Sequence, residues 1–147
     1  MGNKSLNELA DYIYRQNKEL GWWTNLQYQP LLKDLIGAGF SQDEAVRLLN
    51  LLGIKEELDR DFGTVAALIT SEISEALEAD RKGLMDDKLP HRRGVEVELV
   101  DAIIRILDYS GRHGFDLDGA LFEKLAYNAN RADHKIENRL KDGGKSY

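Results

Sequence analysis

The segment from residue 95 to 109 constrains the fold most, because its apolar residues lie on almost every side of a helix. These apolar residues are Val97, Leu99, Val100, Ala102, Ile103, Ile104, Ile106 and Leu107. The polar residues gather mainly into one stripe, made of Glu98, Asp101, Arg105 and Asp108. A helix of this kind needs neighbours on several sides, and a single domain of 147 residues supplies few of them. We therefore expect a partner subunit.

Two acidic pairs, Glu72-x-x-Glu75 and Glu98-x-x-Asp101, lie inside strongly helical segments. A spacing of three places both members of a pair on one helix face, about one turn apart. Either pair alone is typical of a solvated helix face, but each of these lies on or beside an apolar stripe. Buried carboxylates are costly unless they are paired or bind a metal. Together the four acids predict a cation site, and an all-oxygen ligand set favours Mg²⁺, Mn²⁺ or Ca²⁺.

Helix start and stop signals recur along the chain and predict an all-α helical bundle. Capping boxes at Ser5 and Ser41 open helices that run to about residues 20 and 52, and a short helical stretch begins at Pro30. A long helix is expected over 64–82, with an alternative start at about residue 55. A second long helix is expected over 95–112, and a last helix runs from Asp116 or Asp118 to about 131. No strand alternation is visible. We expect one domain, residues 1–147, with its core at about 64–131 and a polar tail at 132–147.

Composition excludes several classes of function. The chain has no cysteine, which excludes disulfides, thiolate zinc sites and cysteine nucleophiles. Its net charge is −6 and no basic stripe is visible, so nucleic-acid binding is not expected. No apolar run reaches the length of a membrane span and no signal peptide opens the chain, so we expect a cytoplasmic protein without membrane contact.

The last predicted helix carries a second stripe that has the right chemistry for a phosphate or a sugar. Its members are Leu121, Lys124, Asn128 and Arg131. A solvated C-terminal face, favoured by the helix dipole, explains this spacing equally well. The pair Trp22-Trp23 favours core packing or an interface over stacking on a base.

A di-iron carboxylate bundle is the rival interpretation of four acids on helices, and it requires E-x-x-H pairs. The three histidines, His91, His113 and His134, all lie outside the acidic segments, which argues against this rival. We expect surface or capping roles for them.

At these residues the chain resembles the MazG-like family of all-α nucleoside triphosphate pyrophosphohydrolases, whose signature is E-E-x-x-E followed by E-x-x-D. Here the signature reads Ser71-Glu72-Ile73-Ser74-Glu75 and Glu98-Leu99-Val100-Asp101. Residues 64–131 resemble the family core. Residues 21–23 and 127–135 and the Gly143-Gly144-Lys145 ending are similar to the branch found in bacteriophage and prophage genomes. Ser71 replaces the first glutamate of the signature, and we expect activity to survive because the other four acids match.

The resemblance implies a Mg²⁺-dependent enzyme, with Mn²⁺ as a substitute, that cleaves a (deoxy)nucleoside triphosphate to the monophosphate and pyrophosphate. This reaction would serve nucleotide-pool control. Two or more ions would be held by Glu72, Glu75, Glu98 and Asp101. Glu75 would orient or deprotonate the attacking water. Contacts to phosphate or sugar would come from Lys124, Asn128 and Arg131, in a homodimer or homotetramer whose neighbouring chain completes the pocket.

Two other interpretations stay open. In one, the chain is a non-enzymatic helical interaction module whose acids are solvated or bind a structural ion. In the other, the chemistry is the same but the substrate is dUTP, a damaged nucleotide, an alarmone or a phosphoribosyl nucleotide. The role of residues 24–60 is also open, with a lid or an oligomer contact as candidates.

Overall fold

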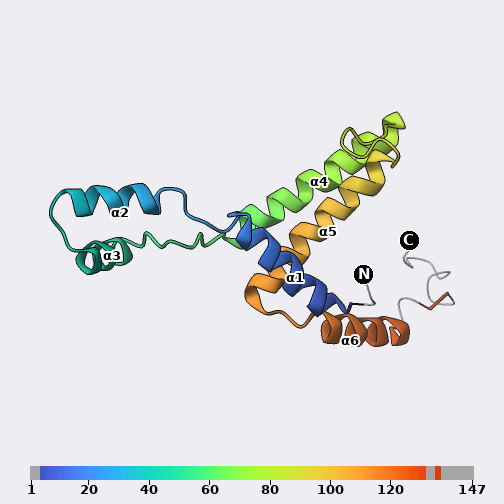
Figure 1. Cartoon of the computed structure of the whole chain (residues 1–147). Helices are drawn as coiled ribbons and strands as arrows, with labels where there is room; N and C mark the ends of the chain where they lie inside the picture. The colour runs from blue at the N-terminus through green and yellow to red at the C-terminus, as the bar shows by residue number, and fades with distance from the viewer. Residues whose placement is uncertain (1–3, 132–134, 137–147) are drawn as a thin grey trace.

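A computed structural model of the chain describes residues 4–131, 135 and 136, and within them the secondary structure is helical without a strand. The prediction of an all-α fold is therefore confirmed. The helices are α1 Leu6–Glu19, α2 Tyr28–Gly37, α3 Gln42–Leu51, α4 Phe62–Lys82, α5 Gly94–His113 and α6 Leu117–Asn130 (Figure 1). None of these helices is long and apolar enough to cross a membrane.

The two longest helices, α4 and α5, form an antiparallel hairpin that is the centre of the molecule (Figure 1). Gly83 ends α4 in the left-handed conformation, with φ of 64°, and Arg81 and Lys82 complement the dipole in its last turn. α1 packs along α5, and α6 packs on α1. The α1 contact with α5 is close, because a Cβ added to Gly111 would lie 2.3 Å from the carbonyl oxygen of Ala10.

Most helix ends follow the sequence signals. Both predicted capping boxes are formed, at Ser5 with Glu8 and at Ser41 with Glu44. Asp116 rather than Asp118 caps α6, by accepting a hydrogen bond from the Gly119 N–H.

Two helices begin two residues before the predicted residues. α2 begins at Tyr28, so Pro30 lies inside the first turn, where its missing N–H costs nothing. α4 begins at Phe62, close to the predicted residue 64, and the alternative start near residue 55 is wrong. Asp61 caps its start by accepting from the Thr64 N–H at 2.9 Å, and the preceding residues pair with another segment instead.

α2 and α3 pack on each other and form an arm that projects away from the hairpin (Figure 1). Two short segments, residues 23–25 and 55–58, connect the arm to the rest, and we call them the neck. They run antiparallel, with a bridge between Thr24 and Glu57. The Leu58 N–H donates to the Trp23 carbonyl at 2.7 Å, and the Asn25 N–H donates to the Glu56 carbonyl at 2.8 Å.

The buried core of this chain is small and rich in alanine, and many large apolar side chains are exposed. Ala10, Ala76, Ala79 and Ala102 are among the buried residues. On the hairpin, the exposed apolar residues include Ile73, Leu77, Leu99, Val100, Ile103 and Ile106. Apolar side chains that gather on neighbouring helices are typical of a surface covered by another molecule.

Candidate metal centre and adjoining pocket

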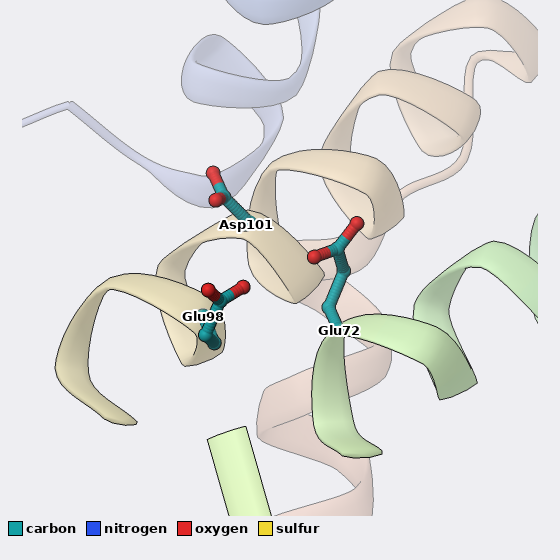
Figure 2. A group of neighbouring side chains, drawn as sticks. All are labelled: Glu72, Glu98 and Asp101. Atoms are coloured by element: carbon teal, nitrogen blue, oxygen red, sulfur yellow. The ribbon is translucent and has the colours of Figure 1, made fainter. Parts of the chain in front are cut away.

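Three of the four predicted acids meet between α4 and α5. One oxygen from each of Glu72, Glu98 and Asp101 lies within 4.8 Å of the others. Figure 2 shows Glu72 reaching from α4 toward the two acids of α5. Glu72 is buried, with 7% of its surface exposed, and the other two are half-buried. The spacing of three within Glu98-x-x-Asp101 puts both α5 acids on the face that packs against α4.

Glu75 lies one turn beyond Glu72 on α4, is exposed, and does not belong to this group of three. The Ser71 hydroxyl donates to its carboxylate at 3.1 Å. Ser71 therefore orients the neighbouring Glu75 carboxylate. Glu75 is still close enough for its charge to raise the pKa of Glu98.

The pKa values of Glu98 and Asp101 both lie above the ordinary values for their side chains. For Glu98, burial is the largest cause, followed by the charge of Glu75 and a hydrogen bond with Glu72. For Asp101, burial again comes first and the charge of Glu72 second, while the Arg105 guanidinium acts in the opposite direction. Carboxylates that repel one another in a partly buried site are stabilised when a cation takes up their charge.

Arg105 is part of this site, although the sequence marked it only as a member of the polar stripe of α5. Its Nε donates to Glu72 Oε1 at 2.6 Å, and its Nη2 forms an ion pair with the same oxygen. Arg105 follows Asp101 by four residues and therefore lies on the same face of the helix. It gives Glu72 a positive partner where burial of a lone carboxylate would be costly.

A pocket of about 260 Å³ adjoins the carboxylates. It is lined by Asn17, Trp22, Arg60, Glu72, Asp101, Ile104, Arg105 and Asp108. α1, α4, α5 and the residues that flank the neck, Trp22 and Arg60, all contribute to this lining. Segments that are far apart in the sequence therefore form one site.

The two neighbouring tryptophans have different environments. Trp23 is buried, with 3% of its surface exposed, and its Nε1–H donates to the buried Asp108 carboxylate at 3.0 Å. Core packing is thus confirmed for Trp23. Trp22 is 57% exposed and lines the pocket.

Lys124, Asn128 and Arg131 do not line this pocket, and they do not belong to the acidic group. They lie on or directly after α6, and the cations of Lys124 and Arg131 lie 5.0 and 5.8 Å from the ring centre of Tyr127. The Oδ1 of Asn128 is buried without a hydrogen-bond partner among the described residues. Their predicted role in substrate binding stays a prediction.

The two described histidines also lie outside the acidic group. His91 is exposed in the connection between α4 and α5, and His113 packs against the rings of Tyr109 and Phe115 near the end of α5. His134 and the Gly143-Gly144-Lys145 ending lie outside the described residues.

No model of a known protein family matches the chain, and neither curated proteins nor solved structures yield a match. The resemblance to the MazG-like family thus stays a prediction.

Proposed function

We propose that the chain is a Mg²⁺-dependent nucleoside triphosphate pyrophosphohydrolase, which converts a (deoxy)nucleoside triphosphate to the monophosphate and pyrophosphate. One observation carries this proposal. Three carboxylates from two helices converge within 4.8 Å, and two of them, Glu72 and Asp101, line a pocket that also presents arginine side chains. Carboxylates that can hold cations beside guanidinium groups suit a polyanionic substrate that enters with metal.

The residues present fit a hard divalent cation. All three acids of the group offer oxygen atoms, and one guanidinium beside them leaves an excess of two negative charges. Mg²⁺ and Mn²⁺ prefer such ligands, and neither thiolates nor histidines compete at this place. Glu72, Glu98 and Asp101 would hold the metal, with Glu75 at the exposed edge.

The proposed reaction needs no covalent intermediate on the protein. Bound Mg²⁺ would offset the charge of the triphosphate and of the departing pyrophosphate. Glu75, which is exposed and oriented by Ser71, would accept the proton of the water that attacks the α-phosphorus. The bond from the α-phosphorus to its bridging oxygen then breaks, and that oxygen leaves with pyrophosphate.

We further propose that the active form is a homo-oligomer. The exposed apolar residues of α5 recur at spacings of four and three, at Leu99, Ile103 and Ile106, and those of α4 at a spacing of four, at Ile73 and Leu77. These spacings place each set on one helix face. Another copy of the hairpin has the complementary apolar surface, which favours a homodimer or homotetramer.

Pyrophosphate release tests the function directly. The protein is incubated with a panel of ribo- and deoxynucleoside triphosphates, with Mg²⁺ and with excess chelator. Release is expected to require the metal and to be abolished by Glu72→Ala or Glu98→Gln. Glu78→Ala is the matched control, because Glu78 lies on α4 in an exposed pair with Lys82, and it should retain activity. A folded protein that binds Mg²⁺ without releasing pyrophosphate from any nucleotide would favour the interaction module with a structural ion.

A further inference from the structure

The pocket contains a second arginine, Arg60, which comes from the chain segment just before α4. Arg60 is half-buried and its position is fixed from two sides. Its Nη2 donates to the Trp22 carbonyl at 2.7 Å, and its guanidinium lies over the ring of Trp23 at 5.4 Å from the ring centre. A guanidinium held in this way keeps its remaining N–H groups in a fixed orientation.

Arg60 differs from the other arginines around this site because its charge has no carboxylate partner. Arg105 pairs with Glu72, and Arg112 pairs with Glu57. Among the described residues, no carboxylate oxygen lies within ion-pair distance of Arg60. Asp108 lines the same pocket, but the bond that it makes goes to the Trp23 indole.

Arg60 shares the pocket with two members of the acidic group. The pocket is lined by Arg60 together with Glu72 and Asp101, and a small adjacent cavity is lined by Arg60, Arg105 and Asp108. A ligand in this pocket therefore meets both of these carboxylates of the acidic group and the Arg60 guanidinium.

We infer that Arg60 binds a phosphate group of a metal-bound polyphosphate in this pocket. The planar fork of arginine matches the oxygens of a phosphate in two parallel hydrogen bonds. This inference rests on the proposed function to the extent that a metal-bound polyphosphate is the ligand.

The test measures binding of inorganic tripolyphosphate with Mg²⁺ by calorimetry, which needs no turnover. Arg60→Gln retains a donor for the Trp22 carbonyl but loses the charge, and Arg60→Lys retains the charge. We expect Arg60→Gln to weaken binding by roughly 10-fold or more and Arg60→Lys to weaken it less. The melting temperature of each variant establishes that it is folded. Arg92→Gln is the control, because Arg92 forms an exposed pair with Glu96 outside the pocket.

Each outcome bears on the inference. If Arg60→Gln binds tripolyphosphate as tightly as the unsubstituted chain, Arg60 only braces the two tryptophans and the inference is wrong. Absence of binding by the unsubstituted folded chain also overturns it. Tight binding that is lost in Arg60→Gln, in a protein that releases no pyrophosphate, supports Arg60 as a phosphate contact and contradicts the hydrolase function.

Discussion

At the scale of single residues, the contact between Arg105 and Glu72 sets the state of the site without metal. Glu72 is buried, and the guanidinium satisfies one of its oxygens with two N–H groups. A divalent cation would supply the same counter-charge from the side of Glu98 and Asp101. Arg105 and a bound cation would therefore stabilise the same carboxylate by independent means.

This sharing predicts how Arg105→Gln behaves. Loss of a charged hydrogen bond should destabilise the metal-free protein by about 2 kcal/mol, and saturating Mg²⁺ should restore most of that loss. Urea unfolding with and without Mg²⁺ measures both values. Arg93→Gln is the control, since the pair of Arg93 with Asp80 is exposed and contributes little. An equal loss with and without Mg²⁺ would show that the metal does not reach Glu72.

Glu98 gives a prediction about pH. Its pKa is raised above the ordinary 4.5, so its contribution to stability is full below that value and is lost as the pH rises through the raised pKa. Glu98→Gln imitates the protonated form. Without metal, this variant should unfold at a higher temperature than the unsubstituted chain at about pH 7, and the difference should vanish toward about pH 4.

Thermal unfolding across this pH range measures the effect of Glu98→Gln. Glu96→Gln serves as the comparison, because Glu96 lies on α5 in an exposed pair outside the acidic group. With Mg²⁺ present, the unsubstituted chain should unfold at a higher temperature than Glu98→Gln, since the variant lacks a metal ligand. Greater stability of the unsubstituted chain at neutral pH without metal would mean that the carboxylates do not repel one another.

At the scale of helices, local chemistry made most elements predictable from the sequence. The capping boxes at Ser5 and Ser41 use side chains within one turn, so a sequence pattern contains the whole interaction. The three-residue spacing of Glu98 and Asp101 likewise placed both on one face of α5. Asp118 shows where this reasoning ends. Its carboxylate accepts from the N–H groups of Leu6 and Asn7, at the start of a helix more than a hundred residues away.

The neck and the pocket wall could not be predicted from the sequence, because both are formed by residues that are far apart along the chain. The neck consists of a few backbone hydrogen bonds between residues 23–25 and 55–58, too short for any alternation to appear. Arg60 joins the site through the carbonyl of Trp22, which is 38 residues earlier in the chain. Neither Arg60 nor Trp22 has a local sequence pattern that marks it as part of a site, because only the tertiary fold brings the two residues together.

At the scale of the whole molecule, the hairpin predicts where copies of the chain meet. Ile103 is 51% exposed on the apolar face of α5 that also carries Leu99 and Ile106. A glutamate at this position would be buried without a partner in the proposed interface. We expect Ile103→Glu to weaken association by about 4 kcal/mol, or roughly 1,000-fold in the dissociation constant.

Sedimentation velocity over a range of protein concentrations measures this association. Leu20→Glu provides the control, because Leu20 is more exposed, at 73%, but follows α1 rather than lying on the hairpin. An oligomer that persists in Ile103→Glu and dissociates in Leu20→Glu would place the interface elsewhere.

The neck also defines a part of the chain, the arm, that could be removed without separating the chain ends that it connects. The chain leaves the body of the protein at Asn25 and returns at Glu56, and these two residues are joined by a backbone hydrogen bond of 2.8 Å. Residues 26–55 are therefore an insertion whose two ends already touch, and a tight turn could close the gap that their removal leaves. We therefore expect that a chain in which a short turn replaces the arm keeps Trp22 and Arg60 beside the pocket.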